Sequence, residues 1–523
     1  MQMHRNKSVM KHQFSRVPQV EIQRSTFDRS HGNKTTFDAG FLIPILVDEA
    51  LPGDTFKLRM TGFARLATPI FPIMDNMFMD THFFSVPIRL IWDNWQRFNG
   101  EQIDPGDSTD FLVPQIVSPA GGYAHGSLYD HLGIPPGVGG LSHSALPLRA
   151  INLIYNQWYR DQNMQDSKIV HRDDGPDPYV DYDLYRRGKR HDYFTSCLPW
   201  PQKGAPVEIP LGTQAPVAYK TISGTNHDGK FSNMFQPAAV TQGTYTSTFG
   251  TAGTYLGDFS EYALYADLSS ATAATVNSLR QAIAVQHVFE MDARGGTRYT
   301  EIIKNFFHVT SPDARLQRPE YLGGGSTPVN VSPIPQTSAT GAYANSPQGN
   351  LAAMGTALLS GHGFTHSFTE HCIVLGFVSV RADLTYQQGL NRMWSRRTRF
   401  DFFLPPLQNI GEQAVLRKEI FADGTIADDT VFGYQERFAE YRYKPSEISG
   451  LFRSTDPLSL DAWHLSQDFA TAPVLDTTFI QENPPVDRIV AVPAQPHFLF
   501  DSYFSMKCTR PMPVYAVPGL RRF

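Results

Sequence analysis

The sequence predicts a mainly β protein with long loops, interrupted by a pair of helices. Its 523 residues include 40 Gly and 38 Pro, so much of the chain must form turns and extended connections. Hydrophobic residues make up 41% and aromatic residues 12%, which is enough for a packed core and excludes a disordered chain. Between the loops, apolar and polar residues alternate in short runs, the pattern of half-buried strands.

The predicted strands begin after a polar, basic segment, residues 1–34, that we expect to be an extended arm. From residue 35 two strand-like runs flank a turn at Pro52-Gly53. Residues 77–92 are a third, aromatic-rich run, and Pro87 predicts that this strand ends, bulges or lies at an edge there. Residues 149–165 carry apolar side chains at helical spacing and predict the first helix.

The helix pair is predicted between residues 275 and 327. The first helix has a broad apolar face and should end near Gly295-Gly296. The second helix has apolar side chains at positions i, i+3, i+4 and i+7, starting from Tyr299. The chain then becomes basic and aromatic and breaks at three consecutive glycines, 323–325.

Two segments differ from the rest in composition. Residues 204–276 contain only seven Asp, Glu, Lys or Arg, and 36 of their 73 residues are Gly, Ala, Ser or Thr. They predict a surface insertion in a body formed by residues 35–203 and 277–506, although their aromatic side chains argue against a simple linker. Residues 321–369 have no Asp, Glu, Lys or Arg over 49 positions, so we expect them to lie over another surface, their own or a neighbour's. A buried strand follows at 373–380.

Charge is distributed unevenly along a chain of net charge −5. Residues 1–35 carry seven Lys or Arg and two acidic residues. The predicted C-terminal tail, 507–523, carries four Lys or Arg and no acidic residue. Basic ends on an acidic body suggest tails that bind a polyanion, and the alternative of ordinary charged, solvated termini stays open. The three cysteines are far apart, which fits synthesis in a reducing cytoplasm, and no secretion signal or membrane-spanning run is expected.

The sequence lacks the short motifs that mark common catalytic and cofactor-binding sites. We find no phosphate-binding loop, nucleophile motif or paired catalytic residues, so we expect no enzyme, no cofactor and no metal site. One alternative stays open, a Ca²⁺ ion bound by the Asp-rich loop, whose spacing differs from that of an EF-hand. That loop contains Asp173, Asp174, Asp177, Asp181 and Asp183.

Two basic, aromatic segments are candidates for contact with single-stranded nucleic acid, because cations bind phosphates and aromatic rings stack on bases. The first contains Arg396, Arg397 and Arg399 beside Trp394 and Phe400. The second contains Lys507, Arg510, Arg521 and Arg522. For the first segment the alternative of arginines that bridge subunits or pack on carbonyls stays open. Removing 507–523 is expected to weaken binding of single-stranded DNA.

Five long stretches resemble the major capsid protein of the Microviridae, small icosahedral single-stranded DNA phages, and in particular its gokushovirus branch. They occur in the family's order and are residues 24–56, 186–204, 279–303, 311–326 and 379–402. The resemblance implies an eight-stranded antiparallel jelly roll of the viral capsid type, with long loops, a few helices and a surface insertion. It also implies a T=1 shell of sixty copies around circular single-stranded DNA.

The resemblance further implies where the chain acts and with what. Residues 204–276 would form protrusions at the threefold axes that contact a host receptor, with Phe231, Phe235, Tyr245, Phe249 and Tyr255 as candidate contacts. The implied partners are an internal scaffolding protein, a DNA pilot protein and a small basic packaging protein. The chain would reside in the virion, after assembly in the host bacterial cytoplasm.

Two other classes of protein fit parts of the sequence. A β-sandwich glycan-binding (lectin-like) protein would explain the aromatic residues and loops, but predicts a small oligomer without affinity for DNA. A β-rich glycosidase would need two carboxylates facing one cleft, which the sequence cannot place. The basic termini weigh against both.

Overall fold

The computed structural model describes residues 23–207, 217–221, 226–227, 262–266, 276–337 and 348–515. The chain divides into two compact units, one formed by Met1–Pro201 with Gly296–Phe523 and the other by Gln202–Gly295. In the described part of the chain, no helix combines the length and the apolar character needed to cross a bilayer.

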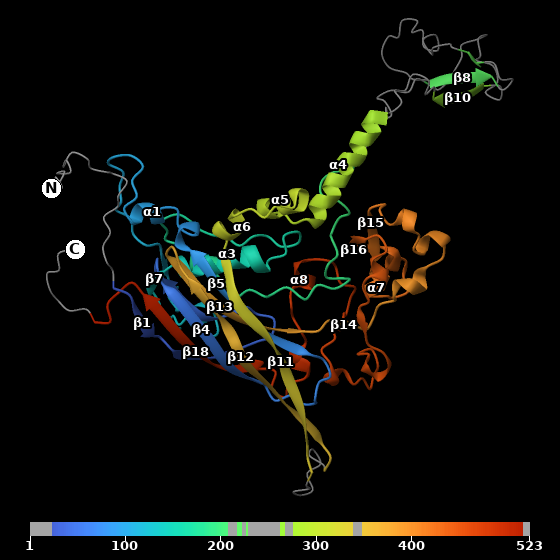
Figure 1. Cartoon of the computed structure of the whole chain (residues 1–523). Helices are drawn as coiled ribbons and strands as arrows, with labels where there is room; N and C mark the ends of the chain where they lie inside the picture. Colours follow the sequence, from blue (N-terminus) through green and yellow to red (C-terminus); the bar gives the residue numbers. More distant parts are fainter. Residues whose placement is uncertain are drawn as a thin grey trace, which may run out of the picture. The chain divides into compact units, whose positions relative to one another are not determined.

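The first unit is built on an antiparallel sheet whose strands follow the order β1-β18-β4-β12-β11-β5-β13-β3, with β2 also paired to β18 (Figure 1). These strands are β1 (Ser25–Asp28), β2 (His31–Phe37), β3 (Ile43–Ala50), β4 (Thr55–Leu66), β5 (Met77–Pro87), β11 (Glu320–Pro335), β12 (Leu351–Ser367), β13 (Cys372–Ala382) and β18 (Phe498–Arg510).

The sheet has jelly-roll topology. One half has the strand order β2-β18-β4-β12 and the other has β3-β13-β5-β11, and β11 joins the halves because it pairs with both β5 and β12. Taken along the chain, the eight strands enter the two halves in the sequence that defines two Greek keys of a jelly roll. The prediction of an eight-stranded antiparallel jelly roll is confirmed.

The two halves differ in how many of their faces are covered. The inner faces of both halves share one hydrophobic core, which includes Phe56, Met60, Phe83, Val378 and Phe504. The outer face of β5 and β13 packs in a second core, against the segment around α3 (Leu146–Ile154). Strand β13 is therefore buried on both faces, which explains its nearly continuous apolar sequence. Strands β4 and β18 instead alternate strictly between buried and exposed residues.

Smaller elements complete the first unit. The short helices are α1 (Trp95–Phe98), α2 (Leu128–His131), α5 (Tyr299–Phe307), α6 (Asp313–Leu316), α7 (Arg417–Ile420) and α8 (Thr477–Ile480). Two-stranded pairs are formed by β6 (Gln115–Val117) with β7 (Ser142–Ser144), β14 (Thr385–Tyr386) with β17 (Ser446–Glu447), and β15 (Glu412–Leu416) with β16 (Val431–Glu436). A third core joins the chain around Tyr193 to β15, β16 and α8.

The second unit contains a three-stranded sheet and a long helix. The strands are β8 (Val217–Thr221), β9 (Asn226–His227) and β10 (Tyr262–Ala266), in the order β10-β8-β9. Helix α4 (Val276–Arg294) ends next to Gly295-Gly296, as predicted. Its predicted apolar face is largely exposed: Ile283 is 61% exposed and Val288 is 41% exposed.

Several local predictions can be compared with these elements. Strand β5 ends at Pro87, and both members of the helix pair form, as α4 and α5. The helix predicted at 149–165 begins earlier, as α3, and ends in a π-helical turn, Tyr155–Tyr159. Residues 321–369, expected to lie over another surface, form much of β11 and β12 of the main sheet, and their inward side chains, such as Leu359, pack in the chain's own first core.

The two basic ends also contribute to the sheet. Within the segment expected to be an arm, residues 25–28 and 31–34 belong to β1 and β2 and pair with β18. Within the segment expected to be a tail, residues 507–510 are the end of β18 itself. Cutting the chain before Lys507 would thus remove four strand residues, including Cys508, whose side chain is buried. A truncation that tests the tail alone must therefore keep residues 507–510.

Candidate nucleic-acid interface

Strand β4 presents basic side chains on the outer face of its half of the sheet. Because successive side chains of a strand point to opposite faces, Phe56, Leu58 and Met60 enter the core, while Lys57 and Arg59 are exposed. The outward positions Thr61, Phe63 and Arg65 continue the same face, and Phe63 is 49% exposed.

The register with β18 brings another cation to this face. Lys507 lies opposite Lys57, Ser505 lies opposite Arg59, and Tyr503 lies opposite Thr61. Side chains directly opposite each other on antiparallel strands have Cβ atoms about 5 Å apart. Tyr503 is 54% exposed, so an aromatic ring is accessible among the cations. We call Lys57, Arg59, Phe63, Arg65, Tyr503 and Lys507 the basic sheet face.

The charges on the basic sheet face are only partly compensated. Strand β2 adds one cation, Lys34, and β1 adds the carboxylate of Asp28, while β18 itself carries the carboxylate of Asp501. Lys34 Nζ lies 3.6 Å from Asp501. Asp28 has a lowered pKa because Ser30 donates hydrogen bonds to it, and Lys507 lowers the pKa further. Like charges placed directly opposite each other destabilise a sheet, so Lys57 and Lys507 favour the binding of an anion between them.

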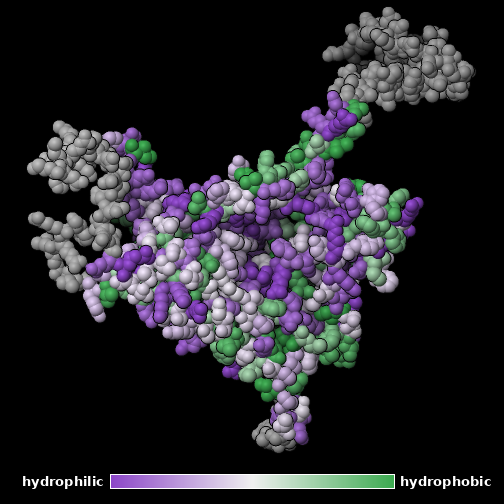
Figure 2. Space-filling view, viewed as in Figure 1, coloured by the Kyte–Doolittle hydropathy of each residue, from purple (hydrophilic) through white to green (hydrophobic). Residues whose placement is uncertain are grey.

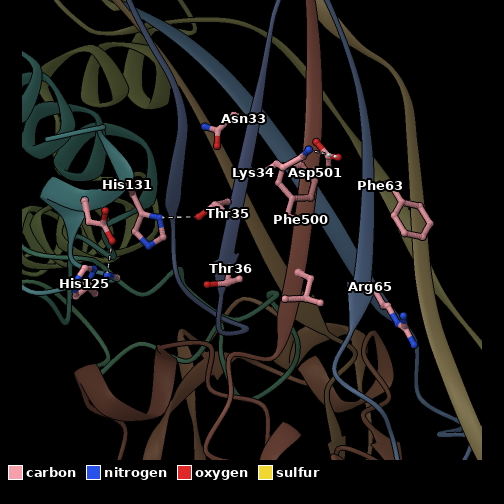
Figure 3. A pocket seen from close by; sticks show the side chains of 13 residues that line it. Asn33, Lys34, Thr35, Thr36, Phe63, Arg65, His125, His131, Phe500 and Asp501 are labelled. Carbon is pink, nitrogen blue, oxygen red and sulfur yellow. Dashed lines mark hydrogen bonds and ion pairs between the residues drawn. The ribbon is translucent and has the colours of Figure 1, made fainter. Parts of the chain in front are cut away.

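An open groove of about 690 Å³ adjoins the basic sheet face (Figure 3). Lys34, Asp501, Phe63 and Arg65 lie along the strands, and the segment with His125 and His131 forms the opposite wall. The Nδ1 atom of His131 is 3.1 Å from the hydroxyl of Thr35, which holds the wall to β2. Burial lowers the pKa of His131, so its ring is neutral near pH 7, and Asp130 places a carboxylate on the same wall.

A second basic, aromatic surface lies on the predicted segment 391–400. Arg397 and Arg399 are exposed, and Trp394 is 70% exposed. Phe400 is also exposed beside them. Exposed rings next to arginines have the composition of a single-strand binding surface, but also that of a contact between proteins. The two interpretations of this segment therefore both remain.

Two of the predicted DNA-facing arginines have structural partners. The guanidinium of Arg396 is 3.4 Å from Glu440 and lies over the ring of Tyr441, and its side chain is only 12% exposed. Arg510 is 3.0 Å from Asp54, a fully buried carboxylate. Both guanidinium groups neutralise buried or nearly buried acids, so they have little surface for a phosphate. Their acidic partners are 44 residues or more away along the chain, beyond the reach of local sequence patterns.

The Asp-rich loop is organised by an arginine. His171, Asp173 and Asp177 have ligand atoms within 4.8 Å of one another, a distance that a metal ion could bridge. However, Arg149 Nε donates to Asp177 at 2.8 Å, and its Nη2 lies 3.3 Å from Asp173. His171 Nε2 is 2.7 Å from Asp181. The guanidinium of Arg149 thus supplies the positive charge that a Ca²⁺ ion would otherwise bring.

The remaining predicted site residues cannot be placed. Arg521 and Arg522, and the candidate host contacts Phe231, Phe235, Tyr245, Phe249 and Tyr255, lie outside the described residues. Of the predicted DNA-facing residues that the structure describes, Arg397, Arg399 and Lys507 are exposed, but they lie on two different surfaces.

Lys57, Arg59 and Arg65 are not among the DNA-facing residues predicted from the sequence. A usable signal was present, because these cations and Phe63 all occupy odd-numbered positions in a run with period-two alternation. The period predicts that they share one face. It does not predict that Lys507, 450 positions away from Lys57, lies beside them.

Comparisons with known proteins identify the family. Residues 15–520 match the family model described as "Capsid protein (F protein)". The chain is 50% identical to the capsid protein VP1 of Bdellovibrio phage phiMH2K, with 97% of each chain covered. It is 46% identical to capsid protein VP1 of Chlamydia phage 1 and 39% identical to that of Spiroplasma virus 4, with 98% of each chain covered.

These matches span almost the whole chain and agree with the jelly roll. The family and the relatives are all described as capsid proteins. As a capsid protein, the chain is a structural component of the virion. The chain belongs to the F-type phage capsid protein family, as a major capsid protein of the gokushovirus branch of the Microviridae.

Proposed function

We propose that this capsid protein forms a T=1 shell of sixty copies around single-stranded DNA, with the basic sheet face turned toward the genome. The observation that carries the proposal is the cluster of Lys57, Arg59 and Lys507 on a sheet face that the first unit leaves exposed. Nothing in this cluster reads base edges, so the contact is with phosphates and stacked bases of any sequence.

Two features support this orientation over the reverse. The outer face of the other half of the sheet is buried under α3 and its neighbouring loops, so it cannot meet DNA directly. The basic sheet face combines cations with the exposed rings of Tyr503 and Phe63, and aromatic stacking contributes about 1–3 kcal/mol per base in such surfaces. In this proposal Arg397 and Arg399 have only a secondary role in binding DNA.

A charge-removal experiment tests the proposal. We expect the triple variant Lys57→Gln, Arg59→Gln, Lys507→Gln to assemble but to bind single-stranded DNA more weakly and package less of it. Each lost phosphate contact lowers the salt dependence of binding by about 0.7, so the slope of log K against log salt should decrease by about 2. Fluorescence anisotropy with an oligonucleotide and the absorbance ratio of purified particles measure both effects.

A matched control carries the same charge change elsewhere. The triple variant Arg172→Gln, Lys304→Gln, Lys444→Gln removes three exposed cations of the first unit that lie outside the basic sheet face. It should keep the DNA content and the salt slope of the unmodified protein. Equal losses in the two triple variants would refute a specific DNA-facing role for the basic sheet face.

The proposal also includes the insertion and the partners. Residues 204–276 fall within the separate unit Gln202–Gly295, which supports their proposed role in contact with a host receptor. The proposed assembly partners are an internal scaffolding protein, a DNA pilot protein and a small basic packaging protein, with assembly in the host bacterial cytoplasm. Electron microscopy of particles from cells that express the chain with its scaffold would test this: uniform small icosahedra support it, and a lone monomer contradicts it.

A further inference from the structure

The hairpin of β11 and β12 continues past the other strands as a two-stranded ribbon (Figure 1). Pairing of β11 with β5 ends at Val329, and pairing of β12 with β4 begins at Thr356. Beyond these points, residues 330–335 pair only with 351–356 among the residues that the structure describes. We call residues 330–337 and 348–355 the ribbon.

The ribbon is uncharged and partly apolar. It lies within the segment 321–369, which contains no Asp, Glu, Lys or Arg. Ile334 is 48% exposed and Met354 is 40% exposed, and Leu358 near its base is 65% exposed. Figure 2 shows hydrophobic surface where the ribbon leaves the sheet. An isolated two-stranded hairpin is marginally stable in water. The inner face of the ribbon packs on the first unit through Val331 and Ala353, whereas the face with Ile334 and Met354 has no covering surface among the described residues.

The two edges of the ribbon differ. On the β11 side, Pro333 and Pro335 are two residues apart and lack the N–H groups that another strand would need. On the β12 side, residues 351–355 contain no proline and no charged residue. Natural proteins protect free edges with proline or charge, because unprotected edges pair with other chains. Here one edge is protected and the other is left open.

We propose that the ribbon is an assembly arm that packs on a second copy of this chain in the shell, with the open edge of β12 facing that copy. This inference rests on membership in a capsid protein family, whose members associate with copies of themselves. An uncharged ribbon has no attraction for phosphates, so DNA is not its partner. A heterologous contact of this kind, from the arm of one copy to the body of the next, closes into a shell when the symmetry closes.

Cysteine accessibility tests the contact directly. The three native cysteines are all buried, so Met354→Cys introduces a thiol that a maleimide can reach selectively. We expect this thiol to react at least tenfold more slowly in assembled shells than in subunits dissociated from the same shells. Equal reactivity in the two states overturns the proposal. Protection that appears only in scaffold-containing intermediates, and is lost in the finished shell, also overturns it and assigns the arm to the scaffolding protein.

Shortening the hairpin gives a second test. Asn330 and Thr356 are cross-strand partners, so a two-residue Asn-Gly turn can replace residues 331–355. This variant retains all pairing of β11 with β5 and of β12 with β4 but loses Val331 and the buried Ala353, so it should fold with a somewhat lower unfolding temperature than the unmodified subunit. We expect it to bind single-stranded DNA normally but to sediment as free subunits under conditions in which the unmodified chain forms shells. Normal shells from the shortened chain would refute the arm while leaving the proposed function intact.

Discussion

At the scale of single residues, a buried charge cluster links three parts of the first unit. Asp80 on β5 accepts hydrogen bonds from Arg187 at 2.6 Å and from Arg381 of β13 at 3.1 Å. Burial alone would raise the pKa of Asp80, but Ser326 and the two arginines lower it. The same two arginines also act on His82, which lies two positions after Asp80 on the same face of β5. The cluster therefore influences the charge states of both Asp80 and His82.

His82 has the most consequential shift. Burial and the nearby Arg187 lower its pKa from 6.5 to about 4, and Nδ1 lies 2.8 Å from the hydroxyl of Tyr159. In the unfolded chain His82 binds a proton below pH 6.5, whereas in the folded chain it stays neutral until about pH 4. The unfolded state thus binds more protons in this window, and stability falls as the pH falls through it.

We expect this group to cost the folded subunit about 2 kcal/mol at pH 5 relative to pH 7. His82→Gln should remove that part of the pH dependence, seen as a smaller decrease of the thermal unfolding temperature of unassembled subunits between pH 7 and pH 5. His125→Gln, at an exposed position, should leave the decrease unchanged. An identical pH dependence in His82→Gln and the unmodified chain would contradict the assignment.

At the scale of elements, a buried ion pair fastens α3 to the Asp-rich loop. Arg149 and Asp177 have side chains that are 0% and 1% exposed. The guanidinium also donates to the carbonyls of Ile91 and Asp173, so it joins α3 to two further segments. Burial lowers the pKa of Arg149, but Asp177 more than compensates, and the pKa is raised overall. The second core of the first unit is thus organised around a charged pair.

Removing one partner of this pair should be more damaging than removing both. Arg149→Met leaves Asp177 buried without its counterion, and we expect a loss of about 3–5 kcal/mol in the free energy of unfolding. The double variant Arg149→Met with Asp177→Leu should recover part of that loss, because two apolar groups replace the pair. Denaturant unfolding of the four proteins of this double-mutant cycle measures the coupling; additive losses would contradict a direct interaction.

At the scale of the whole molecule, the chain separates a sheet-based unit from the unit Gln202–Gly295. The first unit contains the three hydrophobic cores and the basic sheet face. The unit Gln202–Gly295 includes the segment whose composition differs from that of the rest of the chain. Shell formation and host attachment are therefore proposed for different units.

Replacing residues 205–275 by a short Gly/Ser loop tests this separation. We expect the shortened chain to stay soluble and to form shells, because these residues belong to the separate unit Gln202–Gly295. Particles made from it should fail to infect, as measured by plaque counts at equal particle number. An insoluble product would instead show that the insertion is needed for folding, and normal infectivity would refute a role in attachment.

The sequence by itself determined the features that depend on neighbours along the chain. Alternation predicted β4, proline predicted the end of β5, and helical spacing predicted α4 and α5. Long stretches of similar sequence predicted the family and its jelly roll. The positions of Lys57 and Arg59 on one face also follow from the period of two, although their role did not emerge from it.

Only the tertiary structure decided which of these features are available for function. A period of two gives the same alternation whether the polar face of a strand is covered or exposed. In the folded chain α3 covers the outer face of the other half of the sheet, and the outer faces of β4 and β18 stay exposed. Charge patterns along the chain likewise could not separate Arg510, paired with buried Asp54, from Lys507, which is exposed. Counterions and covering elements come from residues far apart in sequence, so folding is what selects the functional cations.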